Sequence, residues 1–113
     1  MHEYSIVQAL LDRVAEAASG YPEPRVLEVR VRIGELAGVE TALLRKAYDA
    51  FREPTLCRDA ALVIETAPAR WACPRCGADV AAGGVLRCEP CARPARLVEG
   101  DEILLERLEM EVA

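Results

Sequence analysis

Two Cys-x-x-Cys pairs stand close together in the second half of this chain and limit how that half can fold. Cys73-Pro-Arg-Cys76 is followed, after eleven residues, by Cys88-Glu-Pro-Cys91. Each pair suits a tight turn in which both sulfurs face one ion, and two turns supply the four thiolates of a tetrahedral zinc site. Iron stays open as an alternative, because a sulfur-only site suits both metals. Four protein ligands close the coordination sphere, which favours a structural metal over a catalytic one.

The segment around these cysteines differs in composition from the rest of the chain. Residues 67–97 hold five arginines and two acids, whereas residues 98–113 hold one arginine and six acids. Glycines at 77, 83 and 84 suit the turns of a ribbon, and Val80, Val85 and Leu86 are candidates for its short strands. We therefore expect a loop-rich, metal-stapled domain over 67–97. Its arginines either offset the thiolate charge or form a patch for an acidic partner; they are Arg70, Arg75, Arg87, Arg93 and Arg96.

Whole-chain properties exclude several classes of protein. The 113 residues are 52% hydrophobic and carry a net charge of −5, which supports a folded core and argues against a general nucleic-acid binder. No apolar run reaches the roughly 20 residues that span a bilayer, and the first residues do not read as a signal peptide. We therefore expect a cytoplasmic location without a membrane partner, where clustered cysteines bind metal rather than form disulfides.

Hydrophobic periodicity predicts two helices and three strands outside the cysteine segment. The helices are expected over 4–18 and 40–52, the latter with Leu43, Leu44, Ala47, Tyr48 and Phe51 on its buried face. The strands are expected over 26–33, 61–66 and 102–112. In the first strand, Leu27, Val29, Val31 and Ile33 should point inward. In the last, Leu104, Leu108, Met110 and Val112 share one face. The predicted fold class is α+β: two helices packed on a three-stranded sheet, with an inserted zinc-ribbon-like domain. The domains are 1–66 plus 98–113, and 67–97.

The N-terminus offers a second set of metal donors. His2 is the only histidine in the chain. The Met1 amine, the His2 amide nitrogen and the His2 Nδ1 atom can form two fused chelate rings, and planar nitrogen donors favour Ni(II) or Cu(II). A fourth position remains for the amide or carboxylate of Glu3, or for a group elsewhere in the fold. The plain alternative is that His2 is an ordinary surface residue.

These segments together resemble one protein family. Met1-His2-Glu3-Tyr4-Ser5 ahead of an apolar helix, Val31-Arg-Ile-Gly34-Glu35 followed by Val39-Glu40, the paired cysteine turns, and the acidic close from Gly100-Asp101-Glu102 to Val112 are similar to the HypA/HybF family of hydrogenase nickel-incorporation proteins. The resemblance covers essentially the whole chain. The first five residues and the cysteine spacing are its specific parts.

The resemblance implies a nickel metallochaperone rather than an enzyme. In such a protein His2 anchors Ni(II), with Met1 and Glu3 as further donors, in the nickel-binding domain 1–66 plus 98–113. The four cysteines hold structural Zn(II). Nickel passes toward the large subunit of [NiFe] hydrogenase with the GTPase HypB as partner, and urease is a second possible acceptor. Some relatives have a nickel-linked acid at the place of Glu40, which can equally be a helix-start acid that complements the dipole.

One departure and two rival classes remain. Some relatives have a histidine directly after a Cys-x-x-Cys pair, where this chain has Gly77 and Ala92. A zinc-ribbon module for protein or nucleic-acid interaction would need a basic surface with stacking aromatic side chains. Residues 67–97 contain one aromatic residue, Trp71. A zinc or iron enzyme would need an open metal position.

Cys57 lies outside the motif and is expected to be a small buried side chain. Self-association stays open.

Overall fold

The computed structural model describes residues 2–113 and divides into two compact units. The first comprises residues up to Arg32, Val39–Glu65 and Leu104–Ala113, and the second comprises Ile33–Gly38 and Thr66–Ile103. No helix within residues 2–113 is long and apolar enough to cross a membrane.

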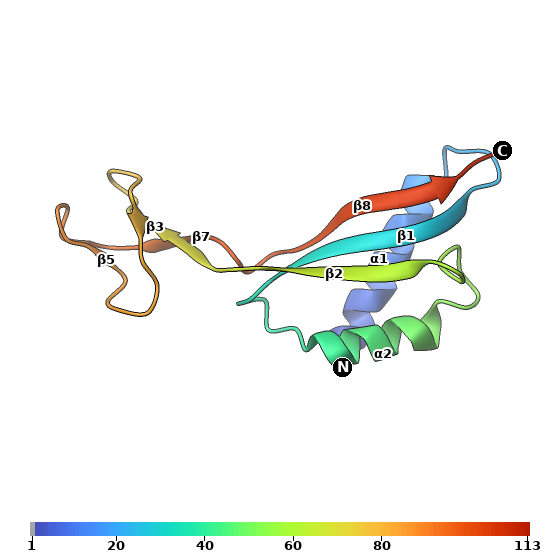
Figure 1. Cartoon of the computed structure of the whole chain (residues 1–113), viewed down its shortest axis with the longest axis horizontal. Helices are drawn as coiled ribbons and strands as arrows, with labels where there is room; N and C mark the ends of the chain where they lie inside the picture. The colour runs from blue at the N-terminus through green and yellow to red at the C-terminus, as the bar shows by residue number, and fades with distance from the viewer. Residues whose placement is uncertain (1) are drawn as a thin grey trace. The chain divides into compact units, whose positions relative to one another are not determined.

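The first unit is built on a three-stranded sheet. Its elements are α1 (His2–Ala18), β1 (Arg25–Gly34), α2 (Thr41–Phe51), β2 (Ala61–Ala67) and β8 (Ile103–Glu111), and the sheet order is β2-β1-β8. In Figure 1, β1 and β2 run the same way and β8 runs back. Parallel neighbours need a crossover connection, and α2 lies in the connection between β1 and β2.

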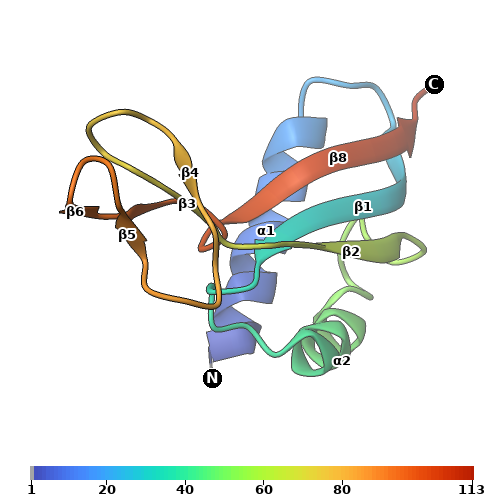
Figure 2. The ribbon, with the colours of Figure 1, turned by 60° about the vertical axis from the view of Figure 1, so that its left-hand side comes forward.

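Both helices cover the buried side of this sheet, so the predicted α+β class is confirmed. Figures 1 and 2 show α1 behind the sheet in both views, and the two helices also contact each other. The largest fully buried side chains are Tyr48, Ile33, Leu44, Val7, Val14, Val26, Val29, Val31 and Cys57. Apolar residues at helical spacing along α1 and the inward-facing valines and isoleucine of β1 are both buried, as expected where a helix covers one face of a sheet.

Two predicted faces differ in detail. In β1, Leu27 was expected inside but is 38% exposed, and Val26 is buried instead. The alternation of buried and more exposed side chains holds only from Val29 onward, because two outward residues, Leu27 and Glu28, separate the buried Val26 from Val29. In α2, Leu43 and Phe51 are 41% and 36% exposed. That helix buries a narrower stripe than the periodicity suggested, since only one side of it meets the layer beneath.

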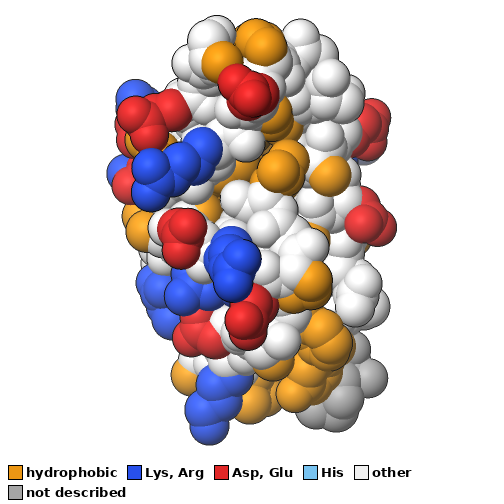
Figure 3. Space-filling model, turned by 90° about the vertical axis from the view of Figure 1, so that its right-hand side faces the viewer, with side chains coloured by type: hydrophobic (Ala, Val, Ile, Leu, Met, Phe, Trp, Pro, Cys, Tyr) orange, Lys and Arg blue, Asp and Glu red, His pale blue; other side chains and the backbone are white. Residues whose placement is uncertain are grey.

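The outer face of the sheet carries paired charges. Arg30 lies 2.6 Å from Glu65 and 3.5 Å from Glu28, and Arg32 lies 3.8 Å from Glu106. Alternating positive and negative side chains are visible along the left of Figure 3. The edge strand β8 is only partly covered: Leu104 is 50% exposed. Charges across an edge strand of this kind oppose pairing with another sheet.

The second unit consists of short antiparallel strands. They are β3 (Arg70–Ala72), β4 (Asp79–Val80), β5 (Arg87–Cys88), β6 (Arg93–Pro94) and β7 (Arg96–Glu99), in one sheet ordered β4-β3-β7 and a ribbon β5-β6. Trp71 pairs with Val80 on one side and Leu97 on the other. Val80 lies in a strand as expected. Val85 and Leu86 lie outside the strands, and Val85 is 78% exposed.

Candidate metal centre

The structure brings the four clustered cysteines together. Their Sγ atoms all lie within 4.8 Å of one another, and those of Cys76 and Cys88 are 3.8 Å apart. Sulfurs at 2.3 Å from a tetrahedral zinc would be separated by about 3.8 Å. The side chains are therefore already gathered for a closed four-sulfur site, and this donor set suits a soft thiophilic metal.

Backbone geometry explains why each Cys-x-x-Cys segment turns toward the same point. After β3, the N–H of Gly77 donates to the Cys73 carbonyl at 3.0 Å, and Gly77 adopts a φ of 77°. After β5, the N–H of Ala92 donates to Glu89 at 3.2 Å, with a φ of 52°. Left-handed residues suit glycine and strain alanine. Gly77 and Ala92 are thus the closing residues of the two turns.

The pKa values of the clustered thiols differ. The Sγ atom of Cys73 accepts from the N–H groups of Arg75 and Cys76 at 3.3 and 3.5 Å. These bonds, that of Cys76 foremost, lower the pKa of Cys73 to about 6. Hydrogen bonding with the Cys76 thiol, together with desolvation, raises the pKa of Cys91 to about 12. A bound cation would reverse that second effect, since coordination favours thiolates.

Two of the arginines near the cysteines have structural partners. Arg70 lies 3.4 Å from Glu99 and 3.7 Å from Asp79, so it ties neighbouring strands together. Arg87 donates to the Ala92 carbonyl at 2.9 Å and so supports the second turn. Arg70 therefore supports the sheet β4-β3-β7 and Arg87 the second cysteine turn, and both add positive charge to the second unit.

The candidate nickel donors at the N-terminus differ in their surroundings. Met1 lies outside the described residues. His2 is the first residue of α1 and is exposed. Glu3 is only 7% exposed, and its Oε2 atom accepts from the backbone N–H of Glu40 at 3.3 Å. That bond is the main reason why the pKa of Glu3 is lowered. The imidazole is therefore open to solvent while the neighbouring carboxylate is already engaged.

Glu40 is the N-cap of α2. Its Oε1 atom accepts from the N–H of Ala42 at 3.3 Å, and its backbone is extended with a φ of −84°. This geometry supports the helix-start interpretation of Glu40, because an N-cap side chain satisfies one of the free amides of the first turn. The sequence contained no signal for the contact between Glu3 and Glu40, which joins residues far apart along the chain.

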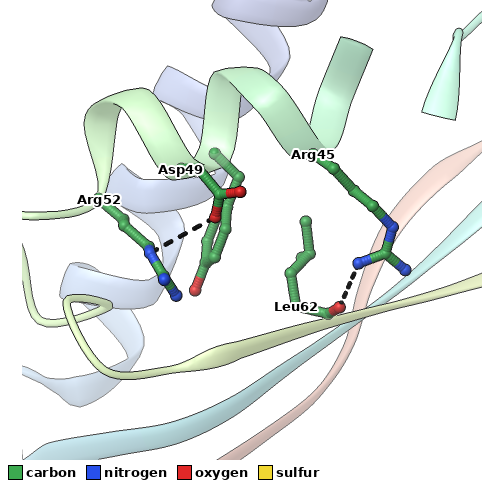
Figure 4. A pocket seen from close by; sticks show the side chains of 5 residues that line it. Arg45, Asp49, Arg52 and Leu62 are labelled. Atoms are coloured by element: carbon green, nitrogen blue, oxygen red, sulfur yellow. Dashed lines mark hydrogen bonds and ion pairs between the residues drawn. The ribbon is translucent and has the colours of Figure 1, made fainter. Parts of the chain in front are cut away.

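The surface around α2 combines apolar side chains with one small pocket. Tyr4 packs edge-on against Phe51 with ring centroids 5.3 Å apart, and hydrophobic side chains gather at the level of α2 in Figure 3. The pocket, of about 90 Å³, is lined by Arg45, Tyr48, Asp49, Arg52 and Leu62 (Figure 4). It lies well below the roughly 300 Å³ of common small-molecule sites.

Comparisons with known proteins agree along the whole chain. The family model described as "Hydrogenase/urease nickel incorporation, metallochaperone, hypA" matches residues 1–110. A hydrogenase maturation factor HypA from Wolinella succinogenes is 42% identical over 98% of this chain and 96% of its own length. One from Shewanella oneidensis is 36% identical over 100% and 98%. The solution structure of the Ni metallochaperone HypA from Helicobacter pylori is similar with a TM-score of 0.75 and 29% identity, covering 98% of each chain.

Proposed function

The chain belongs to the HypA family of nickel-incorporation metallochaperones, and from this premise we propose that it binds Ni(II) at its N-terminus and delivers it during maturation of [NiFe] hydrogenase. Urease is a second acceptor to be tested, since the family description includes it. The proteins that we propose as partners are the GTPase HypB and the hydrogenase large subunit. The proposed compartment is the cytoplasm, where reduced cysteines remain available to a metal.

The exposed His2 at the start of α1 is the observation that carries the nickel proposal. The first N–H groups of a helix have no acceptor within it, so the His2 amide can lose its proton to a metal without breaking a helical hydrogen bond. We propose the Met1 amine, this amide and the imidazole Nδ1 as three nickel donors in a plane. Glu3 is the proposed further donor, through its backbone amide, because its carboxylate is turned toward Glu40.

The second proposed metal is a resident Zn(II) held by Cys73, Cys76, Cys88 and Cys91. The 3.8 Å separation between the Sγ atoms of Cys76 and Cys88 supports it, and sites of four cysteines are typical of structural zinc. When bound, zinc supplies a tetrahedral cross-link and no open coordination position. In Cys73→Ser we expect zinc to be lost and residues 70–97 to exchange amide hydrogens faster. A ribbon that keeps its protection without zinc would contradict the staple.

A nickel titration of the zinc-loaded protein tests the cargo site. Wild type is compared with His2→Ala and with a form carrying one additional residue before Met1, which keeps His2 but displaces the amine. We expect wild type to bind about one nickel with the absorption of a planar nitrogen site. Both altered proteins should lose that absorption while retaining zinc and fold.

Other results of this titration would contradict parts of the proposed nickel site. Unchanged nickel affinity in His2→Ala would remove the N-terminal assignment. Binding by the extended form would show that His2 works without the amine. If none of the proteins binds nickel, the zinc-ribbon interaction module becomes the better description of the chain.

A further inference from the structure

We infer that the carboxylate of Glu3 is a positioning group, which clamps the nickel-binding first turn of α1 to the backbone N–H of Glu40 at the start of α2. The inference rests on the proposed nickel site and adds a residue role to it. Glu3 is the one charged side chain counted among the buried residues of the described chain. Its Oε2 atom accepts from the Glu40 N–H at 3.3 Å.

A buried carboxylate at this place needs an explanation, because an acidic side chain is seldom buried without a partner. Here the partner is a backbone donor that belongs to the N-cap of another helix. The Glu40 side chain turns instead into its own helix, toward Ala42. The two acidic side chains therefore have different roles. Glu40 caps α2, and Glu3 connects the first turn of α1 to the backbone of that cap.

A second contact holds the same turn. The Tyr4 ring packs edge-on against Phe51, with an interplanar angle of 85°. Consecutive residues of α1 thus contact residues at the two ends of α2, one by a hydrogen bond and one by ring packing. A first turn held in this way does not fray as a free helix end would.

The clamp matters for nickel because the proposed donors are the residues next to it. A frayed turn must be ordered when the metal binds, and ordering one backbone residue costs roughly tenfold in a binding constant. A turn that is already held avoids that cost. The geometry also argues against the carboxylate as a nickel ligand, since reaching the metal would take it away from the Glu40 N–H.

Two substitutions of Glu3 separate positioning from ligation. In Glu3→Gln the amide oxygen can still accept from Glu40, whereas Glu3→Ala has no acceptor. Nickel Kd is measured by chelator competition on the zinc-loaded full chain, together with the absorption spectrum. We expect Glu3→Ala to weaken binding about tenfold with the absorption band unchanged. Glu3→Gln should restore Kd to within about twofold of wild type.

Either of two results would overturn the inference. If Glu3→Gln loses affinity as Glu3→Ala does and the band shifts, the carboxylate ligates the metal. If Glu3→Ala lowers Tm but leaves Kd unchanged, Glu3 is only structural. Zinc content and circular dichroism confirm that each variant is folded before its Kd is compared.

The donor side of the clamp provides a matched pair of variants. Glu40→Ala removes the cap but keeps the backbone N–H, and Glu40→Pro removes both; the φ of −84° at this position suits proline. We expect Glu40→Pro to bind nickel more weakly than Glu40→Ala. Adding Glu3→Ala to Glu40→Pro should cause no further loss, because the bond is already absent.

Additive losses in that double variant would contradict the clamp. The His2→Ala protein, titrated in parallel, shows whether nickel is at the N-terminus at all. If it binds nickel as wild type does, the proposed function fails first, and the positioning role falls with it. If it does not bind while Glu3→Ala behaves as wild type, only the clamp is wrong.

Discussion

Gly34 and Gly100 approach each other so closely that neither tolerates a side chain. A Cβ atom on Gly34 would lie 2.1 Å from the carbonyl carbon and oxygen of Gly100. Gly100 has a φ of 118°, and a Cβ there would lie 2.5 Å from the Cα atom of Ala69. The N–H of Leu36 donates to the Gly100 carbonyl at 2.7 Å. Three segments of the second unit therefore meet backbone to backbone at this point.

We expect Gly34→Ala to destabilise the protein by about 2–3 kcal/mol, because the methyl group can fit only if backbone segments separate. Thermal unfolding of the zinc-loaded protein checks this. Gly20→Ala is the matched control, since a Cβ at Gly20 meets nothing within 4 Å, and its effect should stay within about 0.5 kcal/mol. Equal stability of the two variants would show that the close approach is not maintained in solution.

Tyr48→Phe should cost about 1 kcal/mol of stability. The buried Tyr48 hydroxyl donates to the Ala60 carbonyl at 2.8 Å. Arg52 donates to the same carbonyl at 2.8 Å, so the acceptor keeps one partner and the loss stays moderate. Urea denaturation measures the difference, and Tyr21→Phe on the surface, where Tyr21 is 52% exposed, should change nothing. A cost above about 3 kcal/mol would mean that Arg52 does not compensate.

Removal of the metal should expose four thiols and leave the fifth protected. Cys57 is 1% exposed, and its burial raises the pKa of its thiol. After a chelator is added, a thiol-specific disulfide reagent should modify four cysteines, because the segment that buries Cys73 and Cys88 loosens without its metal. Cys57 should react only in denaturant. A fifth fast thiol in the native protein would show that the pocket region around Tyr48 opens readily.

Metal binding at the cysteines should release protons and strengthen as pH rises. The pKa of Cys91 is raised to about 12 and that of Cys88 is also raised, so both thiols are protonated at pH 7 and must each lose a proton to become ligands. The pKa of Cys73, lowered to about 6, means that this group contributes a proton only below about that pH. Calorimetric titrations with Zn(II) in buffers of different ionisation enthalpy would count the protons. Buffer-independent heats would contradict the expected release.

Local sequence patterns were sufficient to place the main elements. Apolar spacing along residues 4–18 predicted α1, the alternation after Val29 predicted most of β1, and the cysteine spacing predicted four sulfurs around one point. These signals are local because helical and strand periodicities are properties of a few consecutive residues. The short strands β3, β6 and β7 carried no such signal, since two- to four-residue strands are defined by their partners rather than by a period.

Local patterns in the amino-acid sequence were enough to predict the fold class, the two helices, the three long strands and which cysteines meet. The sequence also supplied the family through residues that stand together in the chain. Three features became visible only in the folded chain: Val26 rather than Leu27 is buried, Glu3 turns to the N–H of Glu40, and Gly34 lies against Gly100. Each of these depends on a contact between residues distant along the chain. Packing and hydrogen bonding across such distances override local preference, because a side chain follows the neighbours that the fold brings to it.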